Sequence, residues 1–239
     1  MTRVDRAPSR GVMQSAVIIG ASGGIGGALA DAIEEEGAYD RVWRFSRANG
    51  LDLTDEASIA AAAARVAEGP APALVVVATG ILHEGQRGPE KALKDLDAEW
   101  LSRVYAVNTI GPALVAKHFV PLLPRTGTPV FAALSARVGS IGDNALGGWH
   151  GYRASKAALN MLLRNIAIEA RRKYDRTIVV GLHPGTVDTG LSKPFQGNVA
   201  PGKLFAPDRA AVQLLDVIDG LKPHDSGKVF AWDGAEVPF

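Results

Sequence analysis

Two residues with complementary chemistry stand four positions apart in the stretch GYRASKAALN: Tyr152 and Lys156. The stretch has a helical composition, and residues four apart lie on the same face of a helix. A free phenol has a pKa near ~10, too high for ready proton exchange at neutral pH, and a neighbouring ammonium lowers it. The pair therefore predicts a tyrosine that acts as a general acid or base, and the alternative is an ordinary solvated helix face.

A glycine-rich turn near the N-terminus is the second feature that predicts chemistry. In VIIGASGGIGG, Gly20, Gly24 and Gly26 follow a short apolar run and precede a helical pattern. Glycine permits a sharp turn from strand to helix and lets backbone N–H groups approach a pyrophosphate, which the positive end of the helix also attracts. The pattern predicts a dinucleotide-binding turn, and the alternative is a glycine-rich turn without a ligand.

These two features need a scaffold that brings them together, and the hydrophobic pattern of the chain predicts one. Short apolar runs alternate with longer amphipathic stretches, which is typical of parallel strands joined by right-handed helical crossovers. We predict an α/β fold, a Rossmann-like doubly wound parallel sheet of about seven strands with helices on both faces. Strands are expected at 15–20, 41–46, 50–53, 73–80, 128–135, 177–185 and 227–234, and helices at 26–37, 55–69, 97–123, 151–174 and 207–221.

The composition narrows the class of protein. The chain has 239 residues, of which 47% are hydrophobic and 21% charged, with a net charge of +1. This balance is typical of a soluble globular enzyme, and the scattered charges argue against nucleic-acid binding. Cysteine is absent and the histidines are dispersed, so we expect no metal site. The longest apolar run is too short to span a membrane. We expect a cytoplasmic protein with a flexible tail at 1–13 and one catalytic domain at 14–239.

The order of these motifs along the chain resembles that of the short-chain dehydrogenase/reductase family, and especially its C-factor-like, carbonyl-reductase-related branch. The stretch SARVGSIGDNALGGWHGYRASKAALN and the ending WDGAEVPF carry the likeness to that branch. The resemblance implies that Tyr152 and Lys156 are catalytic, and that Asn108 in VNTIG bends its helix around a water and extends a proton relay. It also implies a homodimer or homotetramer that pairs through the long helices.

The catalytic serine has two candidates. The family usually carries Ser-Ser-x-x-Gly after the fifth strand, whereas this chain reads LSARVGS, with Ala136 in place of the second serine. Either Ser135 or Ser140 is available to polarise a substrate carbonyl. We predict Ser135 because it is nearer the end of the strand, and the alternative is weak or lost activity.

The end of the second predicted strand indicates which nucleotide binds. A carboxylate there would bind the ribose 2′-hydroxyl of NAD and repel a 2′-phosphate. Ser46 and Arg47 stand there instead, and an arginine fork suits phosphate, so we predict NADP(H) in preference to NAD(H). A solvated loop arginine is the alternative. The resemblance implies further cofactor contacts from Gly20, Ser22, Gly24, Ile25, Gly26, Asp52, Leu53, Gly80, Tyr152, Lys156, Pro184, Gly185, Val187 and Thr189.

Residues 190–206 have the composition of a mobile lid, and the candidate walls of a substrate pocket are Trp149, His150, Leu191 and Phe195. Together the motifs predict an NADP(H)-dependent oxidoreductase that interconverts a small-molecule carbonyl and an alcohol, with Tyr152 as general acid or base. The alternative is an NADP(H)-binding sensor or signalling protein with little or no activity on the same fold.

Overall fold

The computed structural model describes residues 13–239, and its centre is a six-stranded parallel sheet in the order β2-β1-β3-β4-β5-β8. The strands are β1 (Gln14–Ile19), β2 (Arg41–Phe45), β3 (Ala71–Val77), β4 (Val130–Leu134), β5 (Ile178–His183) and β8 (Val229–Ala231). Two short strands, β6 (Thr186–Val187) and β7 (Leu204–Phe205), pair separately. The chain adds β2 on one side of β1 and β3 on the other, so the order in which strands are added to the sheet reverses between β1 and β3. This reversal is typical of a Rossmann-like fold. The predicted fold is confirmed, with six strands in the main sheet rather than seven.

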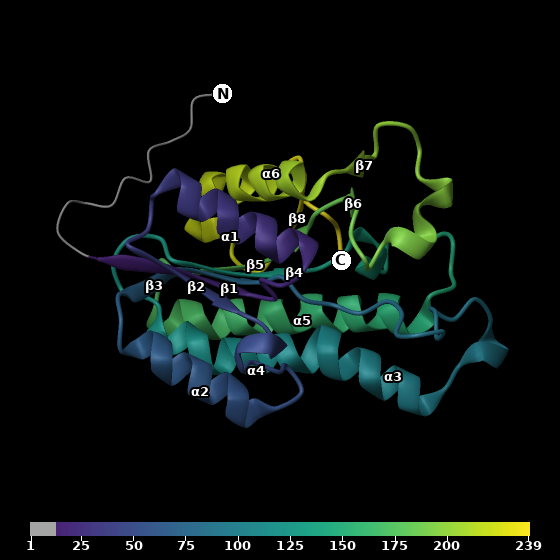
Figure 1. Cartoon of the computed structure of the whole chain (residues 1–239), viewed down its shortest axis with the longest axis horizontal. Helices are drawn as coiled ribbons and strands as arrows, with labels where there is room; N and C mark the ends of the chain where they lie inside the picture. Colours follow the sequence, from purple (N-terminus) through teal and green to yellow (C-terminus); the bar gives the residue numbers. More distant parts are fainter. Residues whose placement is uncertain (1–12) are drawn as a thin grey trace.

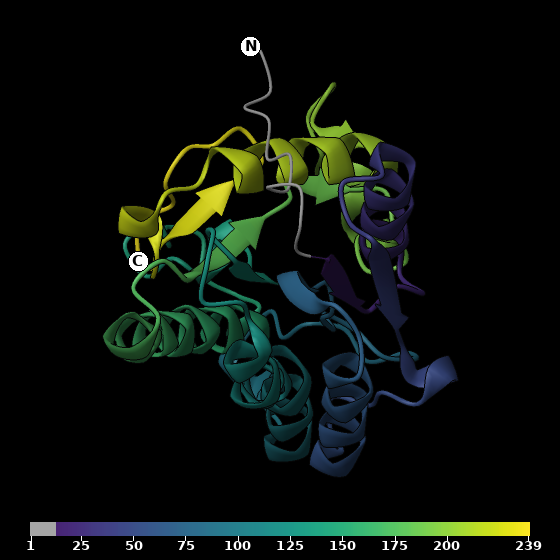
Figure 2. The same ribbon diagram turned by 90° about the vertical axis from the view of Figure 1, so that its left-hand side faces the viewer.

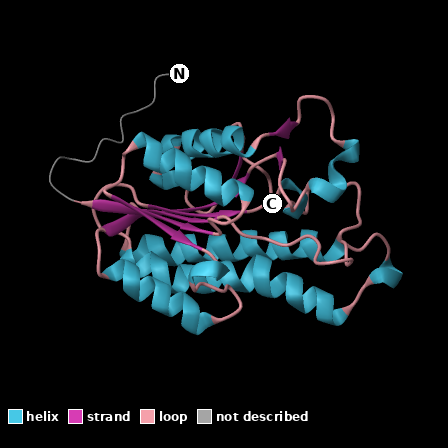
Figure 3. Ribbon diagram, viewed as in Figure 1, coloured by secondary structure: helices cyan, strands magenta, loops and turns pink. Residues whose placement is uncertain are grey.

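Helices cover both faces of the sheet (Figures 1 and 2). One face is covered by α1 (Gly24–Glu36) and α6 (Pro207–Gly220), and the other by α2 (Glu56–Ala67), α4 (Gly111–Phe119) and α5 (His150–Lys173), with α3 (Ala98–Tyr105) preceding α4. Figure 3 shows the strands of the main sheet as a single layer between them. Because both faces are covered, strands such as β4 are buried along their whole length and read as continuous apolar runs.

The strand predicted at 50–53 is wrong, because these residues form a turn. Asp52 Oδ1 accepts hydrogen bonds from the backbone N–H of Thr54 at 2.8 Å and from its hydroxyl at 2.7 Å. The Ser58 hydroxyl accepts the N–H of Asp52 at 2.9 Å. Local bonds from Asp, Thr and Ser side chains compete with a strand ladder, which explains why β-like apolar residues here do not pair.

The helix predicted over 97–123 changes its winding in the middle. After α3 the chain forms a π-helix over Ala106–Ile110, continues as α4, and ends in a 3₁₀ turn at Val120–Leu122. Glycine begins α4 because the helix passes close to the turn after β2: a Cβ added at Gly111 would lie 2.7 Å from Leu53 Cβ. The π-helix therefore lies beside the carboxyl edge of the sheet.

No helix within residues 13–239 combines the length and the apolar character needed to cross a membrane. The tail predicted over 1–13 lies outside the described residues except for Met13. The lid predicted over 190–206 contains a 3₁₀ helix at Lys193–Asn198 and strand β7.

Candidate active site

The first two turns of α5 carry Tyr152 and Lys156, and both side chains are buried. Lys156 Nζ lies 5.8 Å from the centroid of the Tyr152 ring and donates a hydrogen bond of 2.8 Å to the carbonyl of Leu134, the last residue of β4. Burial raises the pKa of Tyr152 to about 12 and lowers the pKa of Lys156 to about 8, because each loses the water that stabilises its charged form. For the tyrosine this direction is opposite to the one expected from the sequence, because the cause that acts in the protein alone is desolvation by burial.

Asn108 lies in the middle of the π-helix and is fully buried. Its amide pairs with the backbone of Ile81: Nδ2 donates to the carbonyl at 2.9 Å and Oδ1 accepts the N–H at 2.8 Å. A Cβ added at Gly80 would lie 3.4 Å from Asn108 Oδ1 and 3.5 Å from Lys156 Nζ. The structure therefore brings Asn108, Gly80 and Lys156 together, and the chain is wound as a π-helix where the sequence predicts a bend.

The serine expected to polarise a carbonyl has another partner. Ser135 is buried, and its hydroxyl donates a hydrogen bond of 2.6 Å to Asn160 Oδ1 on α5. The residue that packs beside Tyr152 is Ala136. Ser140 is also buried, and its hydroxyl accepts the N–H of Asp143 at 3.2 Å in the following turn. Catalysis by Ser135 stays a prediction, and these contacts weigh against it because its proton is already donated within the core.

The glycine turn joins β1 to α1 and leaves room for an anion. Gly20 has a φ of 92°, and a Cβ added at Gly26 would lie 2.2 Å from the Gly20 carbonyl oxygen, so a side chain at position 26 would displace the turn. The helix begins after Gly23, and no side chain within residues 13–239 caps it. Uncapped N–H groups at a helix N-terminus form a phosphate site, so the residues present fit the pyrophosphate of a dinucleotide.

A cleft of about 250 Å³ opens beside this turn at the carboxyl edge of the sheet. It collects residues from the ends of β1, β2 and β3 that the sequence predicts for cofactor binding: Gly20, Ser22, Ser46, Arg47, Asp52, Leu53 and Gly80. Hydrogen bonds from Thr54, followed by the charges of Arg47 and Arg103, lower the pKa of Asp52. A carboxylate and a cation thus stand on the rim of one cleft.

Three residues that sequence reasoning missed belong to this cleft or support it. Asn49 holds the turn that presents Arg47: its Oδ1 accepts the N–H of Ser46 at 2.6 Å and its Nδ2 donates to the Arg44 carbonyl at 2.5 Å. Glu84 and Arg103 line the cleft and form a bidentate ion pair. An Asn before a Gly after the second strand is a turn signal that was available in the sequence; the ion pair joins residues 19 positions apart and leaves no local signal.

An aromatic cluster covers Tyr152. The ring centroid of Trp149 lies 6.3 Å from that of Tyr152 and 5.2 Å from that of Phe195, and Leu191 packs in the same cluster. His83 Nε2 shares a hydrogen bond of 3.0 Å with the carbonyl of Gly190. Three of the predicted pocket walls therefore meet at the lid. The fourth, His150, lines a separate hollow with Ser140 and Arg153.

Trp149 has a φ of 51°, in the left-handed region that residues with bulky side chains rarely adopt. Its N–H donates to the carbonyl of Glu90 at 2.5 Å, and the carboxylate of the same glutamate accepts the N–H of Gly151 at 3.0 Å. Glu90 is buried, and its other oxygen, Oε1, has no hydrogen-bond partner within residues 13–239. Glu90 thus fixes the start of the helix that carries Tyr152, a role that sequence reasoning missed.

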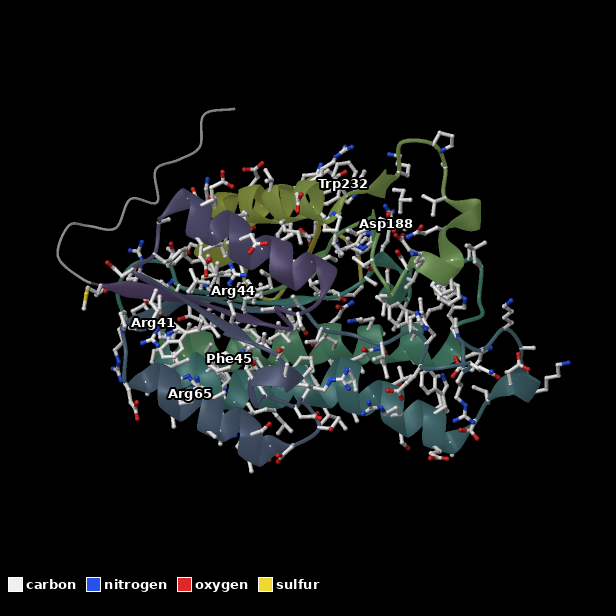
Figure 4. The ribbon with its side chains drawn as sticks, in the orientation of Figure 1. Arg41, Arg44, Phe45, Arg65, Asp188 and Trp232 are labelled. Carbon is white, nitrogen blue, oxygen red and sulfur yellow. The ribbon has the colours of Figure 1, made fainter. Side chains whose placement is uncertain are left out.

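The segment after β5 returns to the glycine turn. A Cβ added at Gly24 would lie 2.8 Å from Thr189 Cγ2, so this segment crosses the N-terminus of α1. Gly185 has a φ of 77° and packs against Trp232, labelled in Figure 4 on the same side of the sheet as Asp188. Of the remaining predicted cofactor residues, Ile25 packs partly buried between α1 and the sheet, Pro184 is partly buried, and Val187 is buried in β6.

The fold and the site define the class of Rossmann-fold oxidoreductases. Residues 20–213 match the family model described as enoyl-(acyl carrier protein) reductase. The chain is 36% identical to the C-signal of Myxococcus xanthus over 159 residues, which cover 66% of this chain and 90% of that protein. It belongs to the short-chain dehydrogenase/reductase family.

Two further relatives are enzymes by their names. The chain is 36% identical, over 186 residues, to 1-hydroxy-2-glutathionyl-2-methyl-3-butene dehydrogenase of Rhodococcus sp. (strain AD45), with 77% of this chain and 76% of that protein covered. Among solved structures, the NADPH-bound carbonyl reductase from chicken fatty liver superposes with a TM-score of 0.81 at 28% identity, covering 95% of this chain and all of that one (100%).

Proposed function

We propose that this protein is an NADP(H)-dependent oxidoreductase that interconverts a carbonyl and an alcohol on a small uncharged molecule. The observation that carries the proposal is the meeting of Tyr152, Lys156 and Asn108 beside a glycine turn whose helix is uncapped by any side chain of the described residues. The NADPH-bound carbonyl reductase with the same fold supports the choice of cofactor. The apolar character of the cluster around Tyr152 supports an uncharged substrate.

Each group of residues has a distinct task in this proposal. The N-terminus of α1 binds the pyrophosphate, and Ser46 and Arg47 bind the 2′-phosphate. Asp52 and Leu53 contact the adenine. The nicotinamide end is held by Gly80, Lys156, Pro184, Gly185, Val187 and Thr189. The cofactor, when bound, supplies or accepts a hydride at the substrate carbon.

Tyr152 moves the proton. It donates the phenol proton to the carbonyl oxygen during reduction and takes a proton from the alcohol during oxidation. The ammonium of Lys156 stabilises the phenolate that remains, and with a pKa of about 8 this lysine exchanges protons readily near neutral pH. Asn108 bonds the backbone N–H and carbonyl of Ile81, the residue after Gly80, and so keeps this wall of the site in place next to Lys156.

The test measures binding and turnover separately. Purified protein is titrated with NADPH and with NADH, and absorbance loss is followed with a panel of aldehydes, ketones and quinones. We expect Tyr152→Phe to lose turnover by at least about 10²-fold while binding NADPH normally, because only the transferable proton is removed. We expect Arg47→Asp to shift the preference towards NADH. Turnover by Tyr152→Phe at the wild-type rate contradicts the proposed chemistry.

A second candidate function has one observation in its favour. Ala136 lies in the same cluster as Tyr152, and Ser135, the residue before it, donates its hydroxyl proton to Asn160, so the site lacks the usual serine partner of the tyrosine. An NADP(H)-binding sensor with little activity is consistent with this. Tight NADPH binding without turnover of any carbonyl in the panel, or of alcohols in the reverse direction, favours the sensor.

We also propose that the protein is a homodimer or homotetramer. Ile110, Met161 and Ile168 remain 51%, 61% and 46% exposed on the outer side of the helices that carry Asn108 and Tyr152. Exposed apolar side chains on neighbouring helices are typical of an interface. Light scattering coupled to size-exclusion chromatography tests this, and a monomer at micromolar concentration contradicts it.

A further inference from the structure

The cleft beside the glycine turn has an ion pair on its rim that the proposed function does not use. Arg103 on α3 donates to Glu84 through Nε at 3.2 Å to Oε2 and through Nη2 at 3.0 Å to Oε1. Glu84 lies in the loop after β3. Such a two-point bond holds the guanidinium plane in one orientation, which a single bond from a lysine would not do.

Apolar side chains form part of the walls of the cleft. Leu51 and Leu53 are buried on the β2 side, and Val107, one turn after Arg103, lines the cleft from the helical side. A cleft with apolar side chains in its walls and a fixed, flat cation on its rim suits a planar aromatic ring, because a guanidinium stacks on ring faces. The adenine of a dinucleotide is such a ring.

We propose that Arg103, oriented by Glu84, stacks on the adenine ring of the cofactor and is a determinant of cofactor affinity; this rests on the proposed function. Recognition of the 2′-phosphate belongs to Arg47 instead. Two donors of Arg103 are already bound to a carboxylate, whose negative charge opposes a second anion at the same place. Arg47 is exposed and is presented by the turn that Asn49 holds.

The two arginines are separated by comparing cofactors that differ only in the 2′-phosphate. Dissociation constants for NADPH and NADH are measured by fluorescence titration of the full chain. We expect Arg103→Leu to raise both constants by the same factor, about tenfold, because both molecules carry adenine. Arg47→Ala raises the constant for NADPH alone. Arg171→Leu, an exposed arginine in the last turn of α5, is the matched control and changes neither.

A second variant guards against a general loss of structure. Arg103→Lys keeps the charge but loses the flat two-point bond to Glu84, and we expect it to weaken binding of both cofactors while the melting temperature of the protein alone stays at the wild-type value. Arg103→Leu that weakens NADPH but not NADH, or neither, overturns the inference. Failure of the wild-type protein to bind either cofactor is a different result, because it refutes the proposed function itself.

Discussion

The Ser135→Ala variant tests whether the hydroxyl of Ser135 stabilises the core or polarises the substrate carbonyl. The hydroxyl donates a bond of 2.6 Å to Asn160 Oδ1, and the two residues are only 4% and 2% exposed. Removing it leaves a buried acceptor without a partner, which costs about 1–3 kcal/mol of unfolding free energy. For a chain of this size that is a fall in melting temperature of roughly 3–9 °C. Because Ala136, not Ser135, packs beside Tyr152, we expect kcat to fall less than about tenfold, whereas loss of a direct oxyanion donor costs about 10²–10³.

Urea unfolding and steady-state kinetics on one preparation measure both effects. Asn160→Ala removes the same hydrogen bond from the other side, so the two single variants and the double variant form a cycle with a coupling energy between these residues. A drop of 10²-fold or more in kcat with unchanged stability refutes the reasoning, since it would mean that the Ser135 hydroxyl reaches the substrate.

Three further predictions follow from the site. Between about pH 8 and 10, stability of the protein alone rises with pH by up to about 1.4 kcal/mol per unit, because Lys156 loses its proton near pH 8 when folded but near 10.5 when unfolded. Above pH 10 the trend reverses, because folded Tyr152 keeps its proton to about pH 12. In urea titrations Lys156→Met removes the rise, and an unchanged rise contradicts this origin. Glu90→Leu deprives the Gly151 N–H of its acceptor and costs about 1–3 kcal/mol, whereas the glutamine variant, which keeps an acceptor, costs less in the same assay. Ala136→Ser places a hydroxyl beside Tyr152, and we expect kcat for carbonyl reduction to rise at least about tenfold; an unchanged kcat shows that polarisation of the carbonyl does not limit the rate.

The strands and helices were predictable because the burial of each element is reflected in the pattern of apolar residues along its sequence. Strands covered on both faces read as apolar runs, and the helix that begins at His150 was placed within one residue of its start. The turn at 52–54 was missed because Leu51 and Leu53 look like strand residues, while the hydrogen bonds of Asp52 with Thr54 decide the conformation. A hydrophobic pattern reports only the polarity of side chains, whereas here hydrogen bonds between neighbouring residues determine the backbone conformation.

The candidate site was predictable only for residues that belong to short motifs following the strands of the sheet. Gly20, Arg47 and Gly80 follow β1, β2 and β3 in turn, so parallel packing had to bring them to one edge of the sheet. The ion pair of Glu84 with Arg103 depends on how a loop folds back onto a helix, and the sequence carries no periodic trace of it. The pKa of Tyr152 was expected to fall because the sequence shows a neighbouring lysine, but it does not show how far water is excluded.

The π-helix at Ala106–Ile110 holds one residue more than a regular α-helix would hold over the same path. Removing a residue there would restore regular winding and rotate every side chain of α4 by about 100° relative to α3. Gly111 would then leave its close approach to Leu53, and Phe119 its place in the core. The position of Asn108 therefore depends on the rotation of the whole of α4 relative to α3. That rotation changes when a residue is inserted or deleted, and it does not change stepwise through single substitutions.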